Sequence, residues 1–175
     1  VFYKKKLAVN KPSNFAVFVK KFLKNYSSTI IDVGCGNGRD LFYFKKNKFD
    51  VMGIELSKNA VSLIKKGLEN TKDKKKIIHS DFASFDYKKN VKKKFSIYSR
   101  FTWHTINERS EGTLLKKISK IANLEYIFVE TRSDKDELCG VGKKISKNEF
   151  ETDHYRRFIN KNNFVKKIKK SFKII

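Results

Sequence analysis

Three glycines on alternate positions follow a short apolar run near the start of the chain, in the stretch IIDVGCGNGRD at residues 30–40. The chain has only eight glycines, and three of them are Gly34, Gly36 and Gly38. Glycine adopts positive φ and lets a bound molecule approach bare backbone, whereas an ordinary strand-to-helix turn needs only one or two glycines. The stretch therefore favours a buried strand, a ligand-binding loop and a helix, in that order.

Strand-like and helix-like segments alternate around this loop. Continuous apolar runs predict five strands, at 29–33, 50–54, 76–79, 95–99 and 126–130. Apolar residues at helical spacing predict helices at 14–25, 39–46, 57–68, 113–122 and 153–169. Strands that are apolar throughout, with helices between them, indicate a sheet covered on both faces. The predicted fold is α/β, with a doubly wound, mainly parallel Rossmann-like sheet.

The organisation of the chain suggests one domain over residues 1–175, with 1–28 as an N-terminal helical segment, because no repeat or Pro/Ser-rich linker interrupts it. The chain does not begin with Met, and FKII at 172–175 resembles the start of a strand. We therefore expect a piece of a longer protein, truncated at the C-terminal edge of its sheet. No apolar run approaches the ~20 residues of a membrane span. Cys35 and Cys139 form no disulfide framework, which favours reduced thiols and a cytoplasmic location.

The formal net charge of +23 has two explanations. Dense Lys and Arg suit a nucleic acid, because they neutralise phosphates. Only 6 of the 41 basic residues are Arg, however, and lysines recur along the whole chain, as the bias of an AT-rich genome would produce. Bidentate recognition of phosphate or guanine favours Arg. We favour genome bias with a solvated lysine surface, and keep a nucleic acid as a less favoured partner.

Acidic residues after successive strands indicate which cofactor the glycine loop holds. The spacing Gly34-x-Gly36-x-Gly38 differs from the dinucleotide fingerprint, and no phosphate-loop pattern is present. Glu55 ends the second predicted strand, 23 positions after Asp32. An ionised carboxylate only accepts hydrogen bonds, which suits the two hydroxyls of a ribose.

The motifs DVGCGNG, ELS and SDF, each after a predicted strand, together resemble the class I S-adenosylmethionine-dependent methyltransferases over residues 13–175. The resemblance implies that the glycine loop holds the methionine part of S-adenosylmethionine, with Asp32 near its amino group. It also implies that Glu55 binds the ribose and that Asp81 accepts from the adenine amino group, and that S-adenosylhomocysteine is the product. The expected cofactor-binding residues are Asp32, Gly34, Cys35, Gly36, Glu55, Leu56, Asp81, Phe82, Ser99 and Arg100.

Motifs after the fourth and fifth predicted strands bear on the methyl acceptor. The Asp/Asn-Pro-Pro-aromatic tetrapeptide of DNA amino methyltransferases is absent, which counts against that activity. R-F-x-x-H, E-x-R-S and H-Y-R-R-F resemble a bacterial methyltransferase group found in surface-polysaccharide gene clusters. That resemblance implies a small-molecule or glycan acceptor, in which a sugar hydroxyl on an anionic or phosphorylated precursor receives the methyl group.

A hydroxyl acceptor needs a base to take its proton. His104 and His154 are the candidate bases, each with a packing role equally open, and Glu130 is a base or an orienting group. A guanidinium suits a carboxylate or phosphate, with salt bridges to nearby acids as the alternative. The candidate substrate-binding residues are Arg132, Tyr155, Arg156 and Arg157. No metal-ligand spacing is present, so no metal is expected.

The leading hypothesis is an S-adenosylmethionine-dependent O-methyltransferase acting on a sugar or another small anionic acceptor. An RNA methyltransferase and a non-catalytic cofactor-binding domain of a larger protein are the alternatives.

Overall fold

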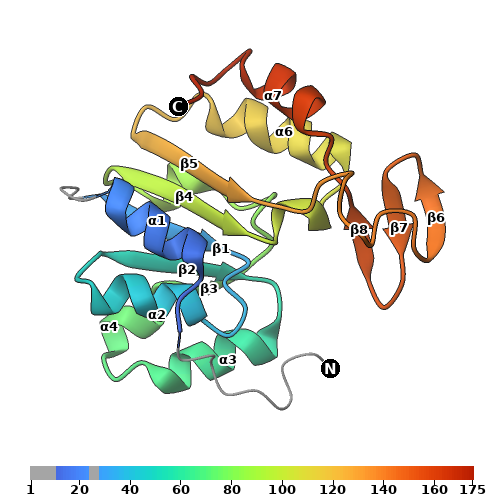
Figure 1. Cartoon of the computed structure of the whole chain (residues 1–175). Coiled ribbons are helices and arrows are strands. Elements are labelled where there is room, and N and C mark those ends of the chain that lie inside the picture. The colour runs from blue at the N-terminus through green and yellow to red at the C-terminus, as the bar shows by residue number, and fades with distance from the viewer. Residues whose placement is uncertain (1–10, 24–27) are drawn as a thin grey trace. The chain divides into compact units, whose positions relative to one another are not determined.

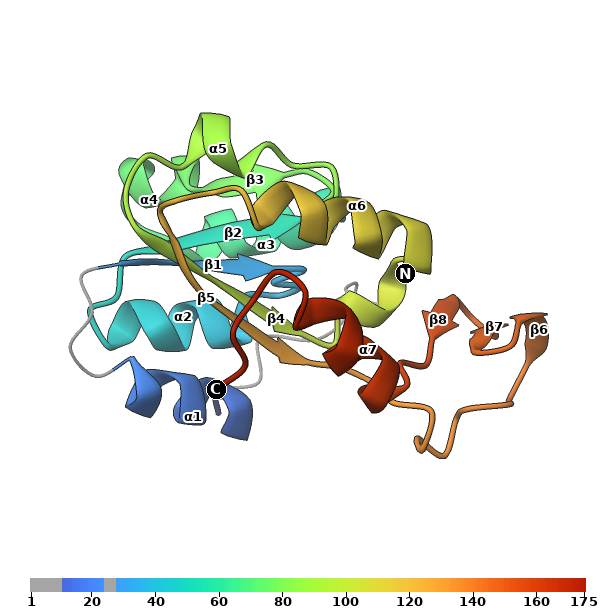
Figure 2. The same cartoon turned by 90° about the horizontal axis from the view of Figure 1, so that it is seen from above.

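The computed structural model describes residues 11–23 and 28–175 (Figures 1 and 2). They form two compact units, of which the first comprises residues up to 100 together with 123–129. The second unit comprises 101–122 and 130–175. A single domain over the whole chain stays a prediction, and residues 1–10 and 24–27 of the expected N-terminal helical segment lie outside the described residues.

A five-stranded sheet in the order β3-β2-β1-β4-β5 is the centre of the first unit (Figure 1). Its strands are β1 Thr29–Val33, β2 Val51–Glu55, β3 Ile77–His79, β4 Phe95–Arg100 and β5 Leu124–Glu130. β1 pairs in parallel with β2 and β4, and β2 pairs in parallel with β3.

Two hydrogen bonds show the direction of β5. At the start of β4, the Phe95 amide donates to the Asn123 carbonyl, and just past its end the Phe101 amide donates to the Glu130 carbonyl. The starts and the ends of the two strands therefore coincide, so β5 is also parallel. The predicted Rossmann-like α/β sheet is confirmed.

The first unit also contains the helices α1 Asn14–Phe22, α2 Arg39–Lys46, α3 Lys58–Gly67, α4 Thr71–Lys75 and α5 Tyr87–Asn90. Ser13 and Ser57 cap α1 and α3, because their hydroxyls accept from the amides three residues later. Buried apolar side chains of α1, α2 and α3 form one core cluster with those of the sheet, including Ile30, Leu41 and Ile64. This packing fixes the strand ends that carry the predicted motifs.

The second unit contains the short 3-10 turn η1 Trp103–Thr105, and the elements α6 Glu108–Ile118, β6 Lys143–Ser146, β7 Glu149–Glu151, β8 Tyr155–Arg157 and α7 Lys161–Ile168. β6, β7 and β8 form an antiparallel sheet in that order. Asn160 caps α7 by accepting from the Asn163 amide at 3.0 Å.

The structure contains both helices predicted for the second unit, but their bounds differ from the predicted ones, and one predicted strand is wrong. The helix predicted at 153–169 begins only at Lys161, because residues 155–157 pair with β7 as a strand. The helix predicted at 113–122 begins at Glu108, where Asn107 supplies the cap, and ends at Ile118. FKII at 172–175 is not a strand, since the Phe172 amide instead donates to the Ile168 carbonyl after α7.

None of the helices in the described ranges is long and apolar enough to cross a membrane.

Gly53, in the centre of β2, tests how tightly the first unit is packed. A Cβ built on Gly53 would lie 2.7 Å from Leu41 Cδ1 and 2.9 Å from Cys35 Sγ. Gly53→Ala should therefore lower the free energy of unfolding by about 1–3 kcal/mol, through overpacking. Urea unfolding followed by far-ultraviolet circular dichroism measures the change.

Gly112→Ala is the matched control, because Gly112 lies in α6 and a Cβ there would meet nothing within 4 Å. It should stabilise the chain by about 0.5–1 kcal/mol, through helix propensity. A Gly53→Ala variant as stable as the original chain would contradict the packing argument.

Candidate functional site

The glycine loop leaves β1 through three left-handed residues. Gly34, Gly36 and Gly38 have φ of 64°, 55° and 83°, values that side-chain-bearing residues rarely adopt. The Gly34 amide donates to the Ile54 carbonyl at 2.7 Å, which ties the loop to β2. The reason for three glycines is therefore conformational at each position, and the loop exposes backbone at the carboxyl end of β1.

A cavity of about 160 Å³ lies at this loop, within the first unit. It is lined by Asp32, Gly34, Cys35, Gly36, Asn37, Arg39, Asp40, Tyr98 and Arg100. Five of the predicted cofactor residues are therefore brought together by the structure. Cys35 is buried and unpaired, and burial raises the pKa of its thiol, with Asp32 and Glu55 adding to the effect.

Two acids, Asp32 and Asp40, and two arginines, Arg39 and Arg100, line this cavity, and Arg39 pairs with Asp40 at 3.4 Å. Burial, followed by the nearby carboxylates of Asp40 and Glu55, raises the pKa of Asp32 well above its usual range, while Arg39 and Arg100 oppose the shift. A cationic group placed among these acids would be attracted to them and would favour their ionised forms. The two arginines offer complementary sites for an anionic group.

Asp40 is a lining residue that the sequence reasoning missed. Its carboxylate accepts from the Ser13 amide at 2.8 Å and the Ser13 hydroxyl at 2.7 Å. The Tyr98 hydroxyl also donates to Asp40, at 2.8 Å. These bonds join the start of α1, the first turn of α2 and β4. An acid two residues after the last glycine is the sequence signal that could have identified it.

Glu55 is held in place by the backbone on both sides of it. One carboxylate oxygen accepts from the Gly36 amide and the other from the Ser57 amide, each at 2.8 Å. Because a carboxylate has about four acceptor positions, both oxygens keep room for further donors. Glu55 is thus fixed beside the glycine loop, with acceptor capacity left over.

The other predicted cofactor residues lie outside the cavity lining. Leu56 directly follows Glu55, and 67% of it is exposed, which is unusual for a leucine and leaves its side chain available for contact. Asp81 accepts from the Ala83 amide at 3.0 Å. Phe82 is buried in the core, and the buried Ser99 hydroxyl has no hydrogen-bond partner among the described residues.

His104 lies in the 3-10 turn of the second unit, after a strained residue. Phe101 has a φ of 51°, in the left-handed region that is costly for an aromatic residue. The imidazole of His104 is only 4% exposed, and its Nδ1 has no hydrogen-bond partner in the part of the chain that the structure describes. The phenyl ring of Phe101 lies edge-on to the imidazole, with 6.5 Å between ring centroids, and the Arg132 guanidinium lies 5.6 Å from the centroid of the same phenyl ring.

His104 stays neutral at ordinary pH. Burial, followed by electrostatic repulsion from Arg132, His154 and Arg156, lowers the pKa of its imidazole to about 4. Four predicted site residues therefore share one electrostatic environment. Glu130 ends β5, and its carbonyl accepts from the Phe101 amide at 2.8 Å, which places it next to the same turn.

The predicted substrate-binding arginines all have carboxylate partners. Arg132 donates to both oxygens of Asp136, at 3.0 and 2.8 Å. Arg156 pairs with Asp153 at 2.9 Å. The exposed His154 also pairs with Asp153, at 3.0 Å. Burial, followed by the neighbouring Glu149, raises the pKa of the Tyr155 phenol. The salt-bridge alternative is thus realised for these arginines, although each keeps further donors.

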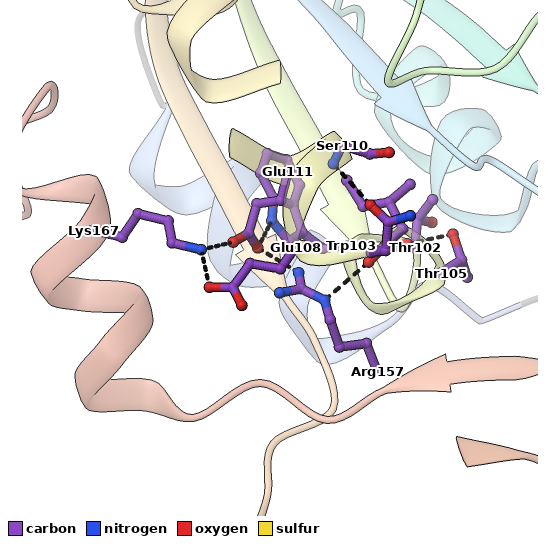
Figure 3. A network of polar contacts seen from close by, with 10 residues as sticks. Thr102, Trp103, Thr105, Glu108, Ser110, Glu111, Arg157 and Lys167 are labelled. Carbon is purple, nitrogen blue, oxygen red and sulfur yellow. Dashed lines mark hydrogen bonds and ion pairs between the residues drawn. The ribbon is translucent and has the colours of Figure 1, made fainter. Parts of the chain in front are cut away.

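Arg157 belongs to a buried network centred on Glu111, which the sequence reasoning missed (Figure 3). Glu111 is 1% exposed and accepts from Arg157 at 2.5 Å, Trp103 Nε1 at 2.9 Å and Lys167 at 2.8 Å. Arg157 Nε also donates to the Ile106 carbonyl at 2.9 Å. The network connects α6, β8 and α7 to the turn that carries His104.

No group of three or more His, Cys, Asp or Glu side chains that could hold a metal ion is found within residues 11–23 and 28–175.

Glu111 and Glu108 provide a matched test of this network, because both lie on α6 and bind Lys167. Glu111→Ala leaves Arg157 and Trp103 Nε1 without their buried acceptor, so the free energy of unfolding should fall by about 3–5 kcal/mol. Glu108 is 74% exposed at its side chain, and Glu108→Ala should cost less than about 1 kcal/mol.

Trp103 is the only tryptophan in the chain, so its fluorescence during urea unfolding reports directly on the Glu111 network. Equal losses of stability in the two variants would show that the network does not hold the second unit together.

Comparison with known proteins identifies the family. Residues 30–123 match the family described as a methyltransferase domain. No curated protein matches the chain significantly by sequence.

Several solved structures share the fold. The glycopeptide N-methyltransferase MtfA, complexed with S-adenosyl-L-homocysteine, is similar with a TM-score of 0.65 and 15% identity, over 100% of this chain and 85% of that chain. An S-adenosylmethionine-dependent methyltransferase from Clostridium acetobutylicum ATCC 824 has a TM-score of 0.62 and 17% sequence identity, over 89% of this chain and 77% of that chain. DesVI from Streptomyces venezuelae is similar with a TM-score of 0.60 and 16% sequence identity, over 90% of this chain and 80% of that chain. Because the family match spans more than half of its residues, the chain belongs to the methyltransferase-domain family, and the predicted methyltransferase fold is confirmed.

Proposed function

We propose that this methyltransferase transfers the methyl group of S-adenosylmethionine to a hydroxyl of a sugar or another small anionic acceptor in surface-polysaccharide biosynthesis. The observation that carries the hydroxyl assignment is the buried, neutral imidazole of His104, whose Nδ1 lacks a partner among the described residues. The acceptor class follows the resemblance of the R-F-x-x-H, E-x-R-S and H-Y-R-R-F motifs. A cytoplasmic location is part of the same proposal.

The residues of the glycine loop fit S-adenosylmethionine. This cofactor carries a positive sulfonium, a positive ammonium and a negative carboxylate, and it supplies an electrophilic methyl group when bound. The acids Asp32, Asp40 and Glu55 suit its cations, and Arg39 and Arg100 suit its carboxylate. Gly34 and Gly36 line the cavity and carry no Cβ, so a ligand can lie against bare backbone there. Gly38 lies outside the lining, where a Cβ would be 2.8 Å from Phe42 Cε2.

The nucleoside part of the cofactor fits the residues after β2 and β3. Glu55 is fixed by two backbone amides and keeps acceptor positions for ribose hydroxyls. The exposed Leu56 side chain offers an apolar surface to the adenine, and Asp81 accepts from its amino group. These assignments follow the class I resemblance residue by residue.

His104 takes the proton of the acceptor hydroxyl in this proposal. An imidazole whose pKa is about 4 is unprotonated throughout the physiological range, so it is always in the proton-accepting form. Arg132 and Arg156 contribute their remaining N–H donors to an anionic group of the acceptor. MtfA, one of the structural neighbours, is a glycopeptide N-methyltransferase, so its glycopeptide acceptor is consistent with a sugar-bearing molecule, while the atom it methylates is nitrogen.

The cofactor assignment predicts the behaviour of Glu55 variants. Glu55→Ala should weaken binding of S-adenosylhomocysteine by at least about tenfold, because hydrogen bonds to a charged group are lost. Glu55→Gln keeps the size of the side chain and one acceptor oxygen, so it should reduce the affinity for S-adenosylhomocysteine less than Glu55→Ala does. Isothermal titration calorimetry measures the affinities, with Glu69→Ala, at an exposed acid outside the site, as the control. An unchanged affinity in Glu55→Ala would remove Glu55 from the cofactor site.

The acceptor assignment predicts where the methyl group goes. Labelled S-adenosylmethionine should label the glycan or nucleotide-sugar fraction of a cell extract, and His104→Ala should reduce that labelling by about 10²–10⁴-fold without changing cofactor affinity. The rate should stay level between pH 5 and 8 and fall only as the pH approaches 4, since protonation of His104 then removes the base.

Other outcomes of this experiment distinguish the alternatives. Label in RNA that is lost on ribonuclease treatment would support an RNA methyltransferase and give the +23 charge a functional role. Cofactor binding without label in any fraction would support a non-catalytic domain. Full activity in His104→Ala together with loss in His154→Ala would transfer the role of base to His154.

A further inference from the structure

A second and larger cavity, of about 320 Å³, lies entirely within the second unit. Residues of α6, the β6–β7 turn, β8 and α7 line it. Its volume is in the range of pockets that hold small molecules, about 300–1,000 Å³. None of the motifs that indicate the cofactor loop contributes to it.

Part of the cavity wall is rigid. Glu111, Arg157 and Lys167 line the cavity, and their ion pairs of 2.5 and 2.8 Å hold them in place (Figure 3). Glu111 is buried and fully engaged by donors, so this wall does not need to reorganise when a ligand binds. The cavity is therefore preformed on this side.

Other residues of the cavity lining carry polar groups with further hydrogen-bonding capacity. The carboxylates of Asp134 and Glu149 line the cavity, and no ion pair to either is found among the described residues. Glu149 also lies beside the Tyr155 phenol, whose pKa it raises. Among residues 11–23 and 28–175, the side-chain donor to Asp134 is the Asn160 amide group, at 2.6 Å. Asn148 and Asn163 add amide donors and acceptors to the lining. Side chains of this kind bind hydroxyl groups as both donors and acceptors.

An aromatic ring completes the lining. Phe164 lines the cavity and is fixed edge-on to Trp103, with 6.2 Å between the ring centroids. A rigid ring beside carboxylates and amides provides an apolar face for the C–H side of a pyranose ring, while its hydroxyls meet the polar wall. The combination suits a hydroxyl-rich small molecule better than a purely apolar one.

The charge of the lining selects among such molecules. Four carboxylates face three cations in this cavity, in a chain whose net charge is +23. Arg157 and Lys167 form ion pairs with Glu111 and Glu108, so these four charges balance. The remaining charged residues of the lining are the acids Asp134 and Glu149 and the exposed Lys147. A positively charged group is therefore favoured and a carboxylate or phosphate disfavoured. No metal-binding group of three or more ligands is present among the residues described, which favours an organic cation.

We propose that this cavity is a binding site for a hydroxylated primary amine of the amino-sugar class, with the ammonium group at Asp134 and Glu149. The site goes beyond the proposed function, because binding there requires neither S-adenosylmethionine nor methyl transfer.

The test titrates the whole chain with D-glucosamine, without cofactor, and follows binding by heteronuclear NMR and calorimetry. N-acetylglucosamine, which has the same ring but no charge, and glucuronate, which is negative, are the comparison probes. Glucosamine should shift the amide signals around Asp134, Glu149 and Phe164, and bind at least about tenfold more tightly than either comparison probe.

Variants locate the ammonium group. Asp134→Asn and Glu149→Gln should each weaken glucosamine binding by about tenfold, since both keep the side-chain shape and remove only the charge. Glu69→Gln, which removes an exposed acid of the first unit, should leave it unchanged. The proposal would be overturned if glucosamine left the amide signals of the unmodified chain unchanged. Equal affinity for glucosamine and N-acetylglucosamine would also overturn it. Cofactor titrations of the same samples test the proposed function separately.

Discussion

The burial of several carboxylates at the carboxyl end of β1 is the constraint on which the first unit depends. Asp40 and Glu55 lie close enough to Asp32 to raise the pKa of its carboxyl, in addition to the effect of burial. Burying like charges is unfavourable unless each has donors directed at it. Those donors come from the backbone of the glycine loop for Glu55, and from Ser13 and Tyr98 for Asp40. The left-handed glycines are thus required twice, to open the loop and to turn an amide toward Glu55.

The two units solve the problem of buried charge in different ways. In the first unit, hydroxyls and backbone amides donate to Asp40 and Glu55, and Arg39 adds one ion pair with Asp40 at 3.4 Å. In the second unit, Glu111 is matched by a guanidinium, an ammonium and an indole N–H. Carboxylates held mainly by neutral donors keep acceptor positions for a cationic ligand, whereas a network matched by cations is suited to holding secondary structure together. The overall charge of +23 reveals neither arrangement, because both are local.

The sequence was sufficient for the parallel sheet and for the residues of the glycine loop, because both leave local patterns. Apolar runs and the order of Asp32, Gly34 and Glu55 are visible without knowledge of distant contacts. It was not sufficient for β8, whose three residues are a strand only because β7 pairs with them. Nor could it assign Arg157 to Glu111, since 46 positions separate the two residues. Partners at such distances are decided by tertiary packing, which no local pattern encodes.

The division of the chain between its units has a consequence for biosynthesis. β5 belongs to the first unit but is synthesised only after residues 101–122, which belong to the second. Until β5 emerges from the ribosome, β4 is the outer strand of a nascent four-stranded sheet, with apolar side chains and one row of unpaired amides and carbonyls. A chain that ends between residues 101 and 122 would contain the whole glycine loop but would lack β5, and the outer edge of β4 would be unpaired. Because an unpaired strand edge can pair with another chain, the addition of β5 is the step that covers this edge of β4 in the growing protein.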